Sequence, residues 1–481
     1  MLEARAHEHI KLLLKRDSLV WPHNLTLSRL VARSLRRHDK SLLQLEIANI
    51  DSWWIGLLVP LCLESSNTVL VLSQREKRRL LQVELPRLKH EGFHFSCWEG
   101  VSPPPEDSIW LMDHREFMNA LENGYLASKQ LIFSEAEFLT TRLRDAMLIE
   151  ICQENWEQLR RTYPSIDSAL LDIYQRLSKR LFTQATREND QVSIDINETM
   201  ALRDLLAILG PLQAPWPKVL KAINQDWASW AKLNHKTLDW DWYLKPLEPF
   251  KMIEKLLSDS PFIMLTGSGQ NNLLLKELES IACPIDVSVT VGGPVHQEPI
   301  QLFVPLRQPL PNTSYYSDHL LDQCRRLILG QSQITILLLD DDQLRRKLAS
   351  ELAAEFGLRV VHQSTTPESN GVICCSSAWW MSCQDQLPLP GQLIIAILPF
   401  PSLESPLISA RVNAFKKQGR DWFRDLLLPD VVNILPRIIE PVRCNQGRVA
   451  VLDGRLRSRS WGTVLFKALQ PWTPIDRLLP H

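Results

Sequence analysis

The sequence predicts an α/β protein with two parallel-sheet domains and a helical insertion in the first. Short apolar runs of strand length alternate with helix-length segments up to about residue 143, and again after about residue 316. Between these stretches, up to about 257, the helical period continues with almost no strand pattern. The chain has 481 residues, of which 45% are hydrophobic and 23% charged. These values exclude a disordered or fibrous protein and allow about two to four domains.

In the first domain, four short apolar segments are predicted to form strands of a parallel sheet. They are residues 41–47, 68–73, 109–112 and 130–133. An amphipathic helix is expected before them at 25–37, with apolar residues on one side and four arginines on the other. This basic face could contact phosphates, although such a face is more often simply solvated.

The middle of the chain, residues 146–255, is expected to form a helical, arch-like insertion. Trp227 and Trp230 are three residues apart and could stack on nucleic-acid bases, although such a pair more often packs in a core. A strand at 262–266 returns the chain to the first domain. The following stretch, 284–316, is rich in Pro, Gly and Val and is predicted to be a linker.

The second domain is predicted from a restart of the α/β pattern. Its strands are expected at 334–339, 358–362, 372–376, 393–398 and 448–452, and its helices at 316–329, 343–356 and 406–426. The predicted division is therefore residues 1–145 with 256–310 for the first domain, 146–255 for the insertion and 311–481 for the second domain.

The composition restricts the partners and the compartment. Lys and Arg number 54 against 55 Asp and Glu, a net charge of −1, so no global positive field attracts nucleic acid or membranes, although local patches remain compatible. The nine cysteines include no C-x-x-C pair, which is typical of reduced thiols in a cytoplasmic protein. The polar amino terminus does not resemble a signal peptide, and no apolar stretch reaches the ~20 residues of a membrane span. We expect a cytoplasmic protein without a membrane partner.

The carboxy-terminal third contains the most specific pattern in the chain. A strand ends in Leu398-Pro-Phe400, Ala410-Arg411 follows, and the stretch 447–453 (Gly-Arg-Val-Ala-Val-Leu-Asp) leads to Arg455. In order and spacing these segments resemble the second motor domain of superfamily 2 helicases of the XPD/DinG type. There, L-P-F precedes A-R, Q-x-x-G-R-x-x-R and G-x-V-x-x-L-D-x-R. The resemblance covers residues 330–470 best and implies two RecA-like motor domains that bind ATP, Mg²⁺ and single-stranded nucleic acid.

The glycine-rich phosphate loop that this resemblance implies is missing. In the family, a loop with Gly, Lys and Ser/Thr follows the first strand and holds the phosphates. The matching stretch is 43–56, and no lysine occurs between Lys40 and Lys77. Gly56 is the one glycine in that interval, and Trp53 and Trp54 stand where the backbone would approach phosphate. The sequence therefore predicts no phosphate loop of this type.

The family's D-E-A-H motif is also altered. Residues 134–137, Ser-Glu-Ala-Glu, follow a strand at the matching position, so the Asp that holds Mg²⁺ is replaced by serine. Glu135 persists as a vestigial catalytic residue. A competing candidate, residues 112–116 (Met-Asp-His-Arg-Glu), also follows a strand, but the basic run at 142–145 after the later site fits the family better.

Two further nucleotide motifs depart from the family pattern. The third motif, S-A-T in the family, corresponds to residues 266–269, Thr-Gly-Ser-Gly. When Q-x-x-G-R-x-x-R is aligned on Arg443, Glu440 occupies the position of the arginine that would reach the γ-phosphate. Arg443 is then the remaining candidate for nucleotide binding.

No metal site is expected. Four cysteines hold the family's iron–sulfur cluster between the first two motifs, whereas only Cys62 and Cys97 occur there in this chain. We therefore expect no iron–sulfur cluster, and ATP with Mg²⁺ as cofactors only if the motor is active.

Single-stranded nucleic acid is the partner that the resemblance implies, with DNA favoured over RNA. Trp379 and Trp380 are the stacking candidates. The backbone-binding candidates are Arg437, Arg455, Arg457 and Arg459. The run 455–459 could equally be a solvated strand end. Three functions remain open: an inactive helicase-like nucleic-acid-binding protein, which we favour; an active ATP-dependent DNA helicase; and a non-catalytic scaffold for protein partners on a helicase fold.

Overall fold

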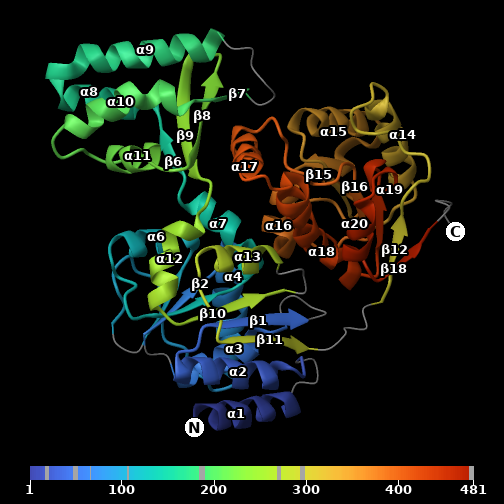
Figure 1. The fold of residues 1–481 in the computed structure, drawn as a ribbon. Helices are drawn as coiled ribbons and strands as arrows, with labels where there is room; N and C mark the ends of the chain where they lie inside the picture. Colours follow the sequence, from blue (N-terminus) through green and yellow to red (C-terminus); the bar gives the residue numbers. More distant parts are fainter. Residues whose placement is uncertain are drawn as a thin grey trace.

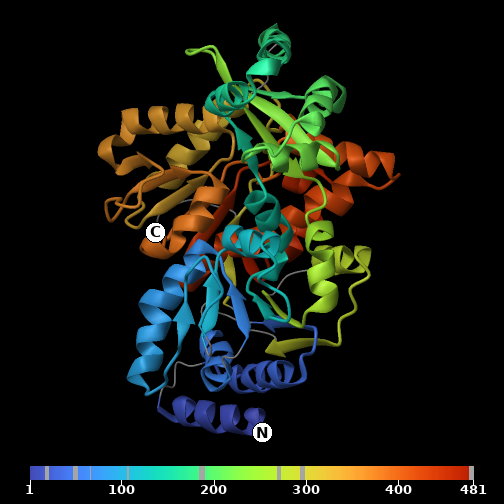
Figure 2. The same cartoon turned by 90° about the vertical axis from the view of Figure 1, so that its left-hand side faces the viewer.

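The computed structural model describes residues 1–16, 21–46, 52–64, 67–105, 108–183, 190–267, 272–292 and 298–475. The α/β class is confirmed, since two seven-stranded sheets with parallel pairing form the centres of two domains. A smaller unit projects from the first domain, and in Figure 1 it lies above that domain and beside the second. Figure 2 shows the same unit at the top of the molecule.

The first sheet has the strand order β11-β1-β10-β5-β2-β4-β3. Its strands are β1 (Ser41–Glu46), β2 (Thr68–Val71), β3 (Cys97–Trp98), β4 (Ile109–Met112), β5 (Gln130–Phe133), β10 (Phe262–Thr266) and β11 (Val287–Gly292). β2, β4, β5 and β10 are buried along their whole length, which explains their continuous apolar sequences. β5 is the middle strand of the seven, so the residues that follow it lie at the centre of the sheet's carboxyl edge.

Helices cover both faces of the first sheet. They are α1 (Leu2–Arg16), α2 (Asn24–Arg37), α3 (Trp54–Leu63), α4 (Gln74–Arg79), α5 (Leu85–His90), α6 (His114–Glu122), α7 (Leu139–Ala146), α12 (Phe250–Asp259) and α13 (Asn272–Ser280). α3 packs under the sheet, α2 packs on α3, and α1 lies outermost, at the bottom of Figure 1.

The prediction of an all-helical insertion is wrong. The unit contains a four-stranded antiparallel sheet of order β6-β9-β8-β7. Its strands are β6 (Ile149–Ile151), β7 (Gln191–Ser193), β8 (Trp227–Asn234) and β9 (Asp239–Pro246), and its helices are α8 (Gln153–Thr162), α9 (Asp167–Thr183), α10 (Ile196–Ile208) and α11 (Trp216–Ile223).

The sequence did contain a signal for these strands. Buried and partly exposed residues alternate along β9, and Trp240 and Trp242 fall on its buried face. Both rings join Trp156 and Trp216 in the core of the insertion. The period of two is hard to recognise because the same tryptophans also fit a helical period.

The second sheet has the order β14-β15-β13-β16-β17-β12-β18. Its strands are β12 (Ile300–Phe303), β13 (Thr335–Leu338), β14 (Val360–His362), β15 (Val372–Cys375), β16 (Gln392–Ile395), β17 (Arg448–Val451) and β18 (Trp472–Pro474). Its helices are α14 (Tyr316–Ile328), α15 (Asp342–Phe356), α16 (Ser377–Cys383), α17 (Pro406–Lys417), α18 (Leu428–Cys444), α19 (Arg455–Ser458) and α20 (Gly462–Ala468).

The predicted linker at 284–316 and the boundary at 310 need correction. β11 is the edge strand of the first sheet, whereas β12 pairs with β17 and β18 in the second sheet. The chain therefore passes between domains after Gly292 and before Ile300. Both strands are short and are separated by Gly and Pro residues, which concealed them.

Within the described ranges, no helix combines the length and the apolar character that crossing a bilayer requires.

Candidate functional site

Glu135 lies at the interface between the two domains, directly after β5. Its backbone is left-handed, with φ of 45°, which turns the chain sharply from the strand into the short helix 136–138. The side chain is 11% exposed. The turn thus directs a carboxylate from the centre of the first sheet towards the second domain.

Three arginines surround this carboxylate. Arg142 on α7 and Arg437 on α18 form ion pairs with it, and Arg75 Nη1 on α4 lies 3.9 Å from Glu135 Oε1. The Arg142 and Arg437 guanidiniums also lie over the Phe138 ring, at 5.5 and 5.7 Å from its centroid. These four charged side chains are called the Glu135 cluster below. Three guanidiniums thus face the one carboxylate of Glu135.

Arg437 gives the Glu135 cluster its inter-domain character, because it is the member that comes from the second domain. Its position allows a second alignment of the helicase motif beside the one made on Arg443. When the helicase motif is aligned on the arginine that reaches the first domain, Q-x-x-G-R-x-x-R becomes Asn433, Pro436, Arg437 and Glu440. The first arginine of the motif is then kept, and the second is an acid.

Arg443 does not reach this interface. Its guanidinium donates to the carbonyl oxygens of Leu469, at 3.0 Å, and Pro471, at 2.9 Å, and burial lowers its pKa. It is 9% exposed. Arg443 therefore holds the chain before β18 in place, and the structure gives it no access to a nucleotide between the domains.

The position of the metal-binding Asp is occupied by a hydroxyl group. Ser134 Oγ donates to Glu76 Oε2 at 2.7 Å. Glu76 is buried and also completes a capping box with Ser73 at the start of α4. The Glu76 carboxylate that Ser134 contacts thus has a structural role in a helix cap.

One ionisable side chain of each candidate motif has a pKa that burial shifts. Burial raises the pKa of the Glu137 carboxyl to about 7, although Arg142 and the Gly267 N–H, 3.3 Å from Oε2, act in the opposite direction. Burial and the nearby Arg142 lower the pKa of His114 to about 3. The third-motif residues Ser268 and Gly269 lie outside the described residues.

The start of α3, where the family's phosphate loop would lead into its helix, is capped by a buried side chain. Asn24 Oδ1 accepts from the Gly56 N–H at 2.9 Å, and its Nδ2 donates to Ser52 O at 2.9 Å. Phosphate loops bind their ligand through amides at this end of the helix. The rings of Trp53 and Trp54 are buried and stacked at 4.3 Å. Residues 47–51 lie outside the described residues.

The competing candidate after β4 has a structural role. Asp113 Oδ1 accepts from the Glu116 N–H at 2.8 Å and caps α6, while its Oδ2 accepts from Gln74 Nε2 at 2.6 Å.

The thiols of Cys62 and Cys97 are partly buried, and burial raises the pKa of each, that of Cys62 to about 12. The described residues hold no group of three or more His, Cys, Asp or Glu placed to bind a metal.

The predicted stacking residues differ in their exposure. Trp380 is fully buried, and its Nε1 donates to Ile438 O at 3.0 Å, so its ring offers no face to a base. Its assignment as a stacking residue is wrong, because the ring fills the core beneath α18. Trp379 is partly buried against the same core.

The arginines of 455–459 serve mostly within the second domain. Arg455 forms an ion pair with Asp453 at 2.7 Å and lies over the Phe400 ring, so the L-P-F and L-D-x-R segments meet in space. Asp453 also accepts from the Leu398 N–H at 3.0 Å. Arg457 donates to Val304 O at 2.8 Å, and Arg459 is exposed.

A groove of about 690 Å³ runs between the insertion, the first domain and α17 of the second domain. Figure 2 shows these three parts meeting, and α17 packs against β8 of the insertion. Seven basic and four acidic residues line the groove, so its walls are positive on balance. The basic residues are Arg144, Arg180, Lys251, Lys276, Arg411, Lys417 and Arg420.

Comparisons with known proteins agree with this architecture. A search with family models matches none to this chain. An apo XPD structure is similar to this chain with a TM-score of 0.62 and 12% sequence identity. The match covers 94% of this chain and 100% of the XPD chain. The structure of Xpd4 from S. tokodaii has the same TM-score and sequence identity, and the match covers 94% of this chain and 99% of the Xpd4 chain. The fold is that of the XPD helicases.

Two curated helicases are similar in sequence to part of this chain. The ATP-dependent DNA helicase YoaA of Escherichia coli is 25% identical over 283 residues, 53% of this chain and 42% of YoaA. Haemophilus influenzae YoaA is 31% identical over 106 residues, 21% of this chain and 16% of that protein. The aligned segments therefore span less than half of either relative. The resemblance to XPD/DinG-type helicases and the two RecA-like domains are thus confirmed.

Proposed function

We propose that this protein is a helicase-like nucleic-acid-binding protein that does not hydrolyse ATP. The observation that carries the proposal is the Glu135 cluster. In helicase motors of this type the acidic pair holds Mg²⁺ and activates water, and arginines stabilise charge on the transferred phosphoryl group. Here Glu135 itself is the anion that the arginines bind.

The surrounding residues do not fit a Mg²⁺–ATP complex. Mg²⁺ requires carboxylate and phosphate oxygens, whereas Ser134 supplies only a hydroxyl bonded to Glu76. The phosphate loop has no lysine, and the Gly56 amide is bonded to Asn24. ATP and Mg²⁺ therefore have no part in the proposed function.

Nucleic acid is the ligand that the groove suits best. Lys417 and Arg420 on its second-domain wall are exposed, and Lys417 has no acidic partner within the described ranges. Trp227, partly exposed on the insertion side, supplies an aromatic face for a base. DNA is favoured over RNA, because the curated relatives with similar sequence are named DNA helicases.

Fluorescence anisotropy with a labelled single-stranded DNA tests this proposal. At low salt, the Lys417→Ala, Arg420→Ala double variant should bind roughly tenfold more weakly, and the log–log salt slope should become less steep by about 0.7 per lost phosphate contact. Lys89→Ala with Arg115→Ala is a matched control, because both are exposed cations of the first domain outside the groove. If the parent chain does not bind at low salt, the proposal fails, and a protein-interaction scaffold on a helicase fold replaces it.

A further inference from the structure

The exposed face of α2 presents a straight row of arginines. Arg29, Arg33, Arg36 and Arg37 are all exposed; Arg29, Arg33 and Arg37 are four residues apart, and Arg36 stands beside Arg37. Since an α-helix rises 1.5 Å per residue, residues four apart are about 6 Å apart along the axis. This step is comparable with the separation of successive phosphates along a nucleic-acid strand. These four residues are called the α2 stripe.

The charges of the α2 stripe are only partly compensated. Arg33 Nε lies 3.7 Å from Asp39 Oδ2, and Arg36 Nη2 lies 2.7 Å from Glu3 Oε1. The two arginine side chains are 45% and 47% exposed, so both guanidiniums remain accessible to a further anion from solvent. Arg29 and Arg37 have no acidic partner within the described part of the chain. The stripe is therefore a local positive surface on a protein whose net charge is −1.

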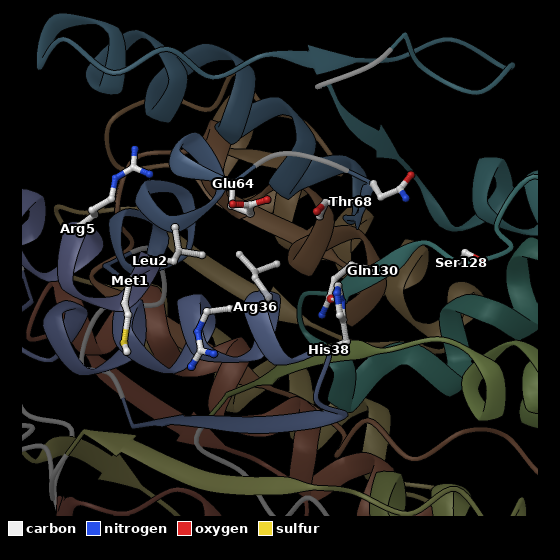
Figure 3. Close-up of a pocket in the computed structure, with 11 residues that line it drawn as sticks. Met1, Leu2, Arg5, Arg36, His38, Glu64, Thr68, Ser128 and Gln130 are labelled. Atoms are coloured by element: carbon white, nitrogen blue, oxygen red, sulfur yellow. The ribbon is translucent and has the colours of Figure 1, made fainter.

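A polar pocket of about 610 Å³ adjoins the end of the stripe. Figure 3 shows Arg5 and Arg36 from α1 and α2 on one side, with His38 next to Gln130. Gln130 is 4% exposed, and its Oε1 lies 3.1 Å from His38 Nδ1. Its Nε2 has no hydrogen-bond partner among the described residues, which is costly for a buried donor. Glu64 is the one carboxylate that lines the pocket among the described residues.

The donors in this pocket suit the oxygens of a phosphate group. Guanidinium groups bind phosphate through paired N–H donors, and the Gln130 Nε2 supplies a further donor from the floor. Arg5 has no acidic partner in the described ranges. A bound phosphate oxygen would satisfy Gln130 Nε2 and add a counter-charge to Arg5 and Arg36.

The pocket and the α2 stripe are separate from the groove and from the Glu135 cluster. Gln130 and Thr68 begin β5 and β2, so the pocket lies at the amino edge of the first sheet, whereas Glu135 lies at the carboxyl edge. Neither the stripe nor the pocket lining contains Trp, Tyr or Phe. His38 is the one ring among the described residues of the stripe and the pocket lining, so arginines dominate this surface and favour contacts with the backbone.

We propose that the α2 stripe and the adjoining pocket bind the phosphate backbone of duplex nucleic acid. A duplex offers regularly spaced phosphates and no unstacked bases, which matches a row of cations without aromatic residues. The inference extends the proposed function to a second contact, at the end of the first domain away from the groove.

Anisotropy with a labelled DNA duplex of about 20 base pairs, at about 50 and 200 mM salt, tests the inference. The Arg29→Ala, Arg37→Ala double variant should bind the duplex roughly tenfold more weakly at low salt, with a salt slope less steep by about 2. Arg5→Ala should weaken duplex binding further. The Lys89→Ala, Arg115→Ala control should leave both values unchanged.

Single-stranded DNA separates this inference from the proposed function. The α2 stripe variant should keep its affinity for a single strand, which the groove variant Lys417→Ala, Arg420→Ala loses. If the stripe variant and the parent bind the duplex equally, the α2 inference is wrong while the groove proposal stands. If the parent binds neither DNA, both fail.

Discussion

Arg437 on α18 of the second domain forms an ion pair with Glu135, which follows β5 of the first domain. In nucleotide-driven motors, a second-domain arginine meets the charge of the transferred phosphate, so contact between the domains depends on the ligand. Here the arginine meets a protein carboxylate. The two RecA-like domains are thus joined through this site by the chain's own residues.

Removal of Arg437 should weaken the coupling between the domains. Arg437→Gln loses the second-domain member of the Glu135 cluster, and we expect a loss of roughly 1–3 kcal/mol in the free energy of unfolding, because the pair is mostly buried. Chemical denaturation measures this loss. Arg326→Gln is the control, since its exposed pair with Asp322 should contribute less than about 0.5 kcal/mol. Equal losses in both variants would contradict the role of Arg437.

Removal of the carboxylate should create an anion-binding site. Glu135→Gln removes the carboxylate that Arg75, Arg142 and Arg437 share. Sulfate in several-fold excess over its Kd should stabilise this variant by roughly 1 kcal/mol more than the parent. Thermal unfolding in sulfate, compared with chloride at equal ionic strength, measures the difference. The same sulfate effect in both proteins would show that the arginines are not held by Glu135.

Glu137 should make stability depend on pH. Burial raises the pKa of its carboxyl from 4.5 to about 7, so the folded state binds this proton more tightly than the unfolded chain does. Its stabilising contribution is therefore present below about pH 4.5 and is lost as the pH rises through about 7. Glu137→Gln should be more stable than the parent at about pH 8, by at most about 3 kcal/mol, and equal to it near pH 4. A difference that does not change with pH would contradict this assignment.

The two neighbouring tryptophans on α16 should respond differently to truncation. Trp380→Ala should cost roughly 3–5 kcal/mol, because it removes a fully buried ring and the hydrogen bond to Ile438 O. Trp379→Ala should cost clearly less, since that ring is partly exposed. DNA affinity per folded molecule should be unchanged in Trp380→Ala. A fall in that affinity without loss of stability would restore Trp380 as a stacking residue.

The sequence predicted the fold where local patterns and long-range packing agree. The continuous apolar strands of both sheets were found, because strands buried on both faces need no alternation. The segments ending at Phe400 and Arg455 were placed correctly in one motif series, and they meet in the structure. The sheet of the insertion was missed, because the alternating residues of β9 also fit a helical pattern rich in tryptophan.

The candidate site could be predicted only in part. Glu135 was found from its position after a strand, but its partners come from three separate helices, which no local pattern connects. Arg437 was predicted as a nucleic-acid contact, and its ion pair with Glu135 across the domains was not predicted. Only the packing of that helix decides which of its arginines faces the first domain.

Hydrolysis of Mg²⁺–ATP by the full chain in the presence of single-stranded DNA tests the central claim most directly. The parent and Glu135→Gln should be measured side by side, with phosphate release as the readout. We predict that both release no more phosphate than a sample without protein, because Glu135 is bound by arginines and the metal-binding Asp and the phosphate-loop lysine are missing. Turnover by the parent that disappears in Glu135→Gln would contradict the account and identify an active motor.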